Sequence, residues 1–130
     1  MLINFSTPFP ISVNQVYYAP FRKIIMTPKA KEFKTWLTGE LKTLVKNGQI
    51  PKLGNAKLSA HYVVIAPDNR VRDLANLDKL LTDTIVNAGI MEDDSQIDDH
   101  RFTRSVVEPG NARIDIFLKK IEGGDLWRLN

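Results

Sequence analysis

Cysteine is absent from this 130-residue chain, so disulfide bonds, thiolate metal sites and a cysteine nucleophile are excluded. Histidine is scarce: only His61 and His100 occur, and they do not have the spacing of a metal-binding pair. The sequence also lacks the glycine-rich loops that bind nucleotide phosphates and the nucleophile elbow of α/β-hydrolases. These familiar sites therefore do not explain what the chain does.

Long hydrophobic runs are missing as well. No apolar stretch approaches the roughly 20 residues of a transmembrane helix. The first ten residues, MLINFSTPFP, do not show the basic start and apolar core of a signal peptide. We therefore expect a cytoplasmic protein without a membrane partner, and the lack of cysteine fits a reducing compartment.

What the chain does contain is ordinary for one soluble globular domain. The apolar fraction is 43% and the charged fraction 25%, so we expect a single domain, residues 1–130, with a buried core. Residues 1–67 carry nine Lys and Arg against two acids, a net charge of +7, whereas residues 68–130 carry nine against thirteen, a net charge of −4. This division suits a protein that binds a polyanion with one part and a divalent cation with the other. A solvated lysine-rich helix surface is the alternative.

Hydrophobic periodicity and turn signals predict two main helices and five strands. The first helix begins at Thr27-Pro28 and ends near Gly48, and the second runs from Asp73 to Gly89. Strands are expected at residues 2–6, 24–26, 56–66, 101–107 and 112–121. The Pro-Gly turn between the last two strands predicts an antiparallel hairpin. The order β(β)αβαββ describes one small α+β domain with a mixed or antiparallel sheet.

The periodicity also predicts which side chains face inward. In the first helix, apolar side chains that include Trp36 recur every three or four residues and predict a buried stripe. In the second helix, Ala75 and Lys79 lie about 40° apart on the side that faces away from the core. Val86 falls on this outer side too, which hints at a partner surface.

Residues 70–99 carry most of the functional signal. Asp73 opens the second helix, and an acidic loop follows it with Glu92, Asp93, Asp94, Asp98 and Asp99. Carboxylates at both ends of one helix suggest a site for a hard metal ion, although Asp73 could also be a helix cap and the loop a solvated turn. With Lys79 and two arginines nearby, the set fits phosphodiester cleavage, in which carboxylates bind Mg²⁺ and a cation stabilises charge on phosphorus.

This stretch resembles the signature of RusA-type Holliday junction resolvases, which follow the pattern R-D-L-D-N-L-x-K, then a helix that ends in A-G, then a D-D-x-Q loop. The matching residues are Arg72, Asp73, Leu74, Asn76, Leu77, Lys79, Ala88, Gly89, Asp93, Asp94 and Gln96. The N-terminal segment is also similar, with Pro8, Pro10, Asn14, Tyr17 and Tyr18. The resemblance spans nearly the whole chain, and its central motif is specific.

The resemblance implies a small homodimeric endonuclease, bacterial or phage-encoded, that makes paired, Mg²⁺-dependent nicks in four-way DNA junctions during recombination and repair, with no small-molecule cofactor. It implies that Asp73 and Asp94 bind the metal ion, that Lys79 positions the phosphate or stabilises charge, and that Asp93 is secondary. We expect DNA contacts from Asn14, Tyr17, Arg22, Lys23, Arg70, Arg72 and Asn76.

Position 75 departs from the family pattern, which has its second aspartate there, whereas this chain has Ala75. An alanine cannot bind a metal ion, so we expect a chain that binds junctions and cuts them poorly. One explanation is an Asp→Ala substitution made to keep DNA intact, which the intact neighbouring motif favours. The other is a natural variant that uses another acid, such as Asp78 or Glu92.

Three classes of function compete on this sequence. The first is the structure-selective endonuclease. The second is a non-catalytic junction- or DNA-binding relative in which Ala75 is natural. The third is an RNA- or protein-binding α+β domain whose acidic loop is only a turn.

Overall fold

The structure, a computed structural model, describes residues 2–10, 17–18, 25–26, 28–70 and 74–121, with only the backbone of residues 17–18 and 25–26. Its elements are β1 (Leu2–Pro8), β2 (Tyr17–Tyr18), β3 (Ile25–Met26), α1 (Pro28–Lys46), β4 (Leu58–Ile65), α2 (Leu74–Asn87), the short 3₁₀-helix η2 (Asp94–Gln96), β5 (Ile97–Arg104) and β6 (Arg113–Lys120). The predicted α+β class is confirmed. The structure adds β2, a two-residue strand paired with β3 where the sequence predicted a loop.

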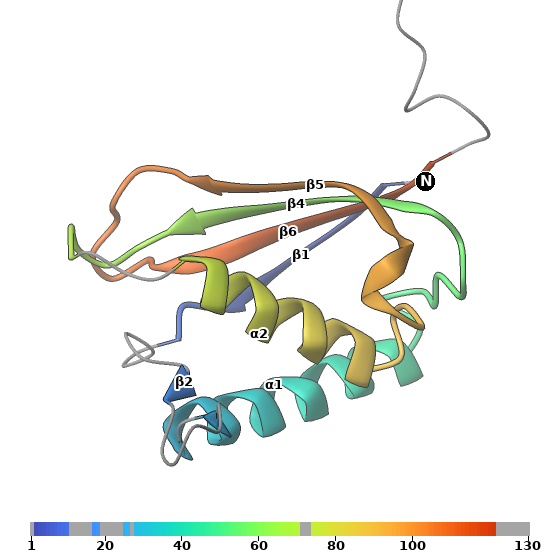
Figure 1. The fold of residues 1–130 in the computed structure, drawn as a ribbon, viewed down its shortest axis with the longest axis horizontal. Coiled ribbons are helices and arrows are strands. Elements are labelled where there is room, and N and C mark those ends of the chain that lie inside the picture. The colour runs from blue at the N-terminus through green and yellow to red at the C-terminus, as the bar shows by residue number, and fades with distance from the viewer. Residues whose placement is uncertain (1, 11–16, 19–24, 27, 71–73, 122–130) are drawn as a thin grey trace, which may run out of the picture.

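The four longer strands form one mixed sheet in the order β1-β6-β4-β5. β6 runs antiparallel to both of its neighbours, and β4 and β5 run parallel. α2 connects these two parallel strands, as a crossover connection requires. Both helices lie on the same side of the sheet (Figure 1). α2 lies next to β5, the strand that follows the acidic turn.

The predicted hairpin of the last two strands is wrong. β4 separates β5 from β6 in the sheet. The reason is hydrophobic burial: β4 and β6 alternate buried apolar side chains, which include Tyr62 and Ile116, and their pairing places both strands in the interior of the sheet. β5, with the sequence IDDHRFTR, is mostly exposed and charged, and such a strand suits an edge.

The last strand but one also begins earlier than predicted, at Ile97 rather than at Arg101. Asp98 and Asp99 therefore belong to β5 and not to the acidic loop. The Asp98 carboxylate lies 3.6 Å from the Lys57 ammonium. The acidic loop that could serve a site is thus shortened to residues 92–94.

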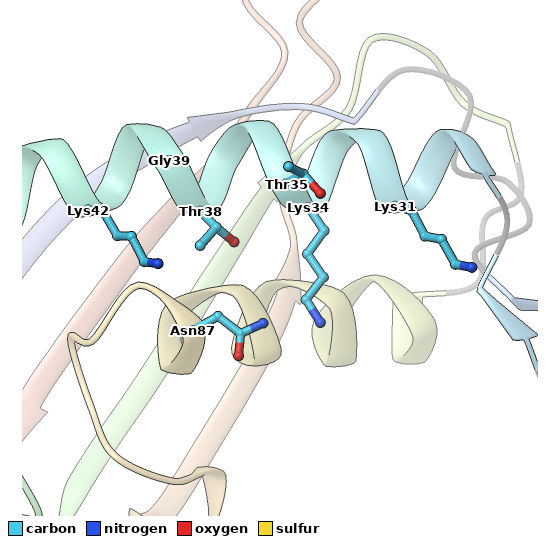
Figure 2. A pocket seen from close by; sticks show the side chains of 7 residues that line it. All are labelled: Lys31, Lys34, Thr35, Thr38, Gly39, Lys42 and Asn87. Carbon is cyan, nitrogen blue, oxygen red and sulfur yellow. The ribbon is translucent and has the colours of Figure 1, made fainter.

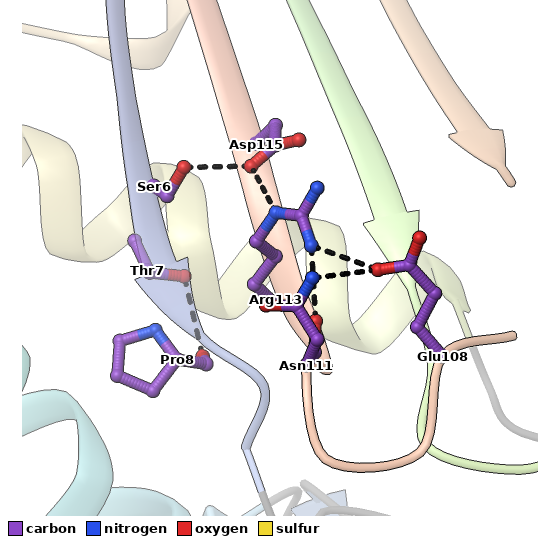
Figure 3. A network of polar contacts seen from close by, with 7 residues as sticks. All are labelled: Ser6, Thr7, Pro8, Glu108, Asn111, Arg113 and Asp115. Atoms are coloured by element: carbon purple, nitrogen blue, oxygen red, sulfur yellow. Dashed lines mark hydrogen bonds and ion pairs between the residues drawn. The ribbon is translucent and has the colours of Figure 1, made fainter. Parts of the chain in front are cut away.

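A polar network fixes the connection into β6 (Figure 3). The Arg113 guanidinium donates to Glu108 and to Asp115, both at 3.1 Å, and the Ser6 hydroxyl of β1 donates to the same Asp115 carboxylate at 2.6 Å. Asn111 donates to Glu108 at 2.8 Å. This network joins β6 to β1 and to the turn at residues 108–111 that precedes β6.

The core lies between the sheet and the helices. Its fully buried large side chains are Tyr62, Leu41, Leu58, Leu80, Leu81, Ile85, Ile90, Met91, Ile114, Ile116 and Leu118. Trp36 does not join them, because 49% of it is exposed. Val86, predicted on the outer side of the second helix, is partly buried and packs against the core, so its apolar side chain is explained without a partner. No helix in the described part of the chain is long and apolar enough to cross a membrane.

Candidate active site

The outer side of α2 carries a row of residues that includes two predicted site positions. Ala75, Lys79, Asp83 and Asn87 follow one another at four-residue spacing, which places them along one side of the helix. Ala75, Lys79 and Asn87 are exposed, and Asp83 is half-buried. The prediction that Ala75 and Lys79 point together, away from the core, is confirmed.

The end of α2 directs the chain toward the acidic turn. Gly89 has a φ of 84°, a conformation that glycine adopts without strain. The N–H of Gly89 donates to the carbonyl of Val86 at 3.0 Å, and the N–H of Ile90 donates to that of Ile85 at 3.3 Å. This is the bonding of a Schellman motif, which ends a helix and turns the chain aside.

Asp93 holds the acidic turn itself. It is the N-cap of η2, and its carboxylate accepts hydrogen bonds from the Ser95 hydroxyl and from the Ser95 N–H, the latter at 3.2 Å. Both bonds lower the pKa of the Asp93 carboxyl, and the bond from the Ser95 hydroxyl has the larger effect. Asp93 is thus occupied in capping, which leaves Asp94 as the carboxylate of the pair that is available to a ligand.

Gln96 anchors the turn to the body of the protein. Its side chain is buried, with 6% exposed. The amide oxygen accepts from the N–H groups of Glu92 and Asp93 at 2.7 and 2.8 Å. The amide nitrogen donates to the carbonyls of Gly54 and Ala56, both at 2.8 Å. The sequence marked Gln96 only as a motif residue, and the structure shows how it fixes the position of the carboxylates beside it.

α2, the acidic turn and β5 enclose a hollow of about 250 Å³. Its lining residues are Ala75, Asp78, Lys79, Thr82, Asp83, Asp94, Ile97 and His100. Ala75, Lys79 and Asp94 therefore meet at one place, although 15 residues separate Lys79 from Asp94 in the sequence. Within the described part of the chain, the Asp94 carboxylate has no hydrogen bond or ion pair.

A second polar group lines the same hollow, in which Asp78, named above as an alternative acid, is joined by Thr82 and His100, which the sequence did not indicate as site residues. The Asp78 carboxylate lies 3.1 Å from His100 Nε2 and accepts from the Thr82 hydroxyl at 3.3 Å. That hydroxyl also lies 2.8 Å from the Tyr62 hydroxyl, whose pKa is raised by burial, and the Tyr62 ring meets the His100 ring edge-on at 4.8 Å. His100 reaches Asp78 because β5 lies parallel to β4, a pairing that was not predicted from the sequence.

Several predicted site residues lie outside the described part of the chain. Asp73, one of the two expected metal ligands, directly precedes α2 and is among them. The expected DNA contacts Asn14, Arg22, Lys23 and Arg72 also lie outside it, as does the side chain of Tyr17. Arg70 is exposed and pairs with Asp68 at 3.7 Å, whereas Asn76 is half-buried.

The described residues alone do not complete a metal centre. Among them, no group of three or more His, Asp or Glu side chains converges closely enough to hold a metal ion. Asp94 therefore contributes one carboxylate to the hollow, and Ala75 contributes a methyl group where a further carboxylate is expected.

Comparison with known proteins identifies the family. The sequence model of endodeoxyribonuclease RusA matches residues 8–119. This chain belongs to the RusA family. The match begins at Pro8 and ends one residue before the end of β6, so it includes both helices, the acidic turn and most of the sheet.

Two relatives of this RusA-family chain are named crossover junction endodeoxyribonucleases. Over 119 residues the chain is 28% identical to the crossover junction endodeoxyribonuclease rusA of Enterobacteria phage HK97. This alignment covers 92% of this chain and 95% of the relative. The chain is 25% identical over 118 residues to the crossover junction endodeoxyribonuclease RusA of Shigella sonnei (strain Ss046), in an alignment that covers 91% and 94%. The similarity thus extends over nearly the full length of these enzymes.

Proposed function

We propose that this chain is a structure-selective endodeoxyribonuclease that resolves four-way DNA junctions by paired, Mg²⁺-dependent nicks, and that Ala75 impairs its cleavage step. The observation that carries the proposal is the meeting of Ala75, Lys79 and Asp94 at one hollow. The names of the two relatives, both crossover junction endodeoxyribonucleases, support the reaction class.

The residues at the hollow fit a hard divalent cation. Asp94 presents an exposed carboxylate without a bond in the described part of the chain. Mg²⁺ prefers oxygen ligands and is commonly held by one or two carboxylates together with phosphate oxygens. We assign Asp94 and Asp73 to this role. A cation held there would polarise the phosphate and lower the pKa of a bound water.

Lys79 has a separate task in this proposal. Its side chain is exposed beside Asp94 and lines the hollow. An ammonium group at this place binds a non-bridging phosphate oxygen and stabilises the negative charge that develops on it during cleavage. Lys79 therefore orients the phosphodiester against the carboxylates.

Ala75 limits this chemistry. Its methyl group accepts no proton from an attacking water and offers no oxygen to a cation, although it faces the hollow in which both would lie. Because DNA binding depends mainly on basic side chains that contact phosphates, the chain with Ala75 keeps its affinity for junctions and loses cleavage rate.

The test compares this chain with its Ala75→Asp variant on an end-labelled four-way junction, with Mg²⁺ and with EDTA. We expect Ala75→Asp to raise the Mg²⁺-dependent cleavage rate by about 10²-fold or more, the effect of one well-placed electrostatic group. Ala75→Asn is the matched control, because it has nearly the same shape without the charge, and it should not restore cleavage. Equal rates for the unchanged chain and Ala75→Asp would contradict the role of position 75.

A non-catalytic DNA-binding relative is the second candidate, and Ala75 favours it. The same Ala75→Asp experiment separates the two, since a chain that has lost its cleavage function elsewhere gains no activity.

A third possibility is that another acid replaces the missing one. Of the two candidates, Asp78 lines the hollow and Glu92 does not. If Asp78 serves, Asp78→Asn removes the residual cleavage of the unchanged chain, whereas Glu92→Gln leaves it unaltered.

The proposal includes a homodimer. Paired nicks at symmetric positions require two sites related by a two-fold axis. This argument rests on the reaction rather than on Val86, which packs against the core of its own chain.

A further inference from the structure

A second hollow lies beside α1 and shares no lining residue with the hollow at the acidic turn. It has a volume of about 780 Å³ and is a wide groove between α1 and the last turn of α2. Lys31, Lys34 and Lys42 of α1 reach into it, and Asn87 of α2 lines its other side (Figure 2). We refer to this feature as the lysine groove.

The charge of the lysine groove is of one sign. Lys31 and Lys42 lie about 20° apart around α1, and Lys34 lies within about 80° of both, so all three project from one side of the helix. None of the three forms an ion pair with a residue in the described ranges. Three ammonium groups without acidic partners favour a ligand with several negative charges.

The spacing of the lysines fits an extended ligand. Eleven residues separate Lys31 from Lys42, which corresponds to about 16 Å along the helix. At a rise of about 3.4 Å per nucleotide, this length matches about five nucleotides of one strand in duplex DNA. Thr38 and Asn87 add hydroxyl and amide donors of the kind that contact phosphates.

Gly39 lies in the wall of the lysine groove. It lies in the interior of α1, where glycine costs helix stability relative to alanine. A Cβ atom built at Gly39 would meet no other atom within 4 Å, and its φ is not in the left-handed region. No contact within the described part of the chain thus requires glycine at this position. Its effect is to leave the backbone bare in the wall of the lysine groove, where a ligand can approach closely.

The outer row of α2 runs from the candidate active site to the lysine groove. Ala75, Lys79 and Asp83 of the outer row of α2 line the hollow with Asp94, and Asn87, the next member of that row, lines the lysine groove. Lys79 and Asn87 are about 12 Å apart along the helix axis. A nucleic-acid arm that passes the active site can therefore extend over α2 into the groove.

We propose that the lysine groove binds the sugar–phosphate backbone of a DNA arm outside the cleavage site. The inference rests on the proposed function, because it assumes a junction as the ligand, and it assigns that ligand a surface that the motif does not include. A second copy of this chain is a poor occupant, since its own groove would bring like charges together.

The test measures binding of a labelled four-way junction in EDTA over a range of salt concentrations. The variant replaces Lys31, Lys34 and Lys42 with glutamine, and the matched control replaces Lys29, Lys52 and Lys119, three exposed lysines that do not line the groove. We expect the groove variant to lose at least about tenfold in affinity near 0.1 M salt. The slope of log affinity against log salt should decrease by about 0.9 for each lost phosphate contact. The control variant should stay closer to the unchanged chain in both quantities.

Gly39→Ala gives a second readout that a purely structural role would not produce. Because alanine favours the helix, we expect the melting temperature to rise by about 2–4 °C while junction affinity falls. If the groove variant and the control variant bind alike, or if Gly39→Ala binds as the unchanged chain does, the inference is overturned and the proposed function stands. If the unchanged chain does not bind a junction at all, both fail.

Discussion

Gln96 shows how a single buried side chain can hold an exposed turn in place. Its buried amide makes four hydrogen bonds that join the acidic turn to residues 54–56. We expect Gln96→Leu to destabilise the protein by about 2–4 kcal/mol, because it leaves buried backbone groups without partners. Urea unfolding measures this loss. In an Ala75→Asp background, the same change should also lower the cleavage rate, since the position of Asp94 is no longer fixed.

Ser95→Ala is the control for Gln96, because Ser95 is exposed and does not enter the core. It should change the urea midpoint much less than Gln96→Leu does. A Gln96→Leu protein that unfolds at the same urea concentration as the unchanged chain would show that the four bonds do not hold the turn.

Asp93 gives a prediction about how the stability of the acidic turn depends on pH. The Ser95 hydroxyl, followed by the Ser95 N–H, lowers the pKa of the Asp93 carboxyl in the folded protein. A carboxyl whose pKa is lower when folded stabilises the fold above its unfolded pKa and loses this contribution as the pH falls through the folded value. We therefore expect the cap of η2 to weaken only in acid. Carboxyl carbon NMR titration of Asp93 should show a higher pKa in Ser95→Ala, and an unchanged value would contradict the assigned cause.

At the scale of elements, the end of α2 decides where the acidic turn begins. Gly89 closes the helix with a positive φ of 84°. Alanine in this conformation costs about 1–2 kcal/mol, so Gly89→Ala should lower the stability by that amount in urea unfolding. Gly89→Asn should cost less, because asparagine tolerates left-handed backbone. Equal losses for the two variants would mean that the backbone conformation is not the cause.

The helices could be predicted from the sequence because their signals are local. Four-residue spacing placed Ala75 and Lys79 together on the outer side of α2, and the structure confirms this. The same kind of argument failed for Val86, which lies near the edge of the apolar face and is partly covered by the core. Spacing on one helix gives the direction of a side chain and not what packs against it.

The sheet could be predicted only in part, because strand pairing depends on distant residues. A turn next to β6 favoured a local hairpin, but burial of the β4 and β6 side chains decides that those two strands pair. A helix between β4 and β5 is the signal that indicates their parallel pairing. Without that pairing, the contact of His100 with Asp78 has no basis in the sequence. The same holds for Gln96, whose partners lie 40 and 42 residues away.

At the scale of the whole molecule, the two halves of the chain differ in charge, and the proposed function gives them different tasks. The first half carries the three lysines of the lysine groove, and the second half carries Asp94 and the acidic turn. α2 lies between these regions and contributes residues to both hollows. In the proposed function, one protomer offers one cleavage site and one basic surface, whereas a junction is to be cut at two symmetric positions.

The need for two sites leads to the last prediction. We expect the chain to sediment at twice the mass of a monomer at the concentrations at which it binds junctions. In an Ala75→Asp dimer, both strands of a cruciform in a supercoiled plasmid are cut while one dimer is bound, so linear DNA is the main product. Mixed dimers formed with an excess of the Asp94→Asn variant contain one competent site and should shift the product to nicked circles. A monomeric mass under cleavage conditions, or mixed samples that still give mainly linear DNA, would show that the two cuts do not come from two paired protomers.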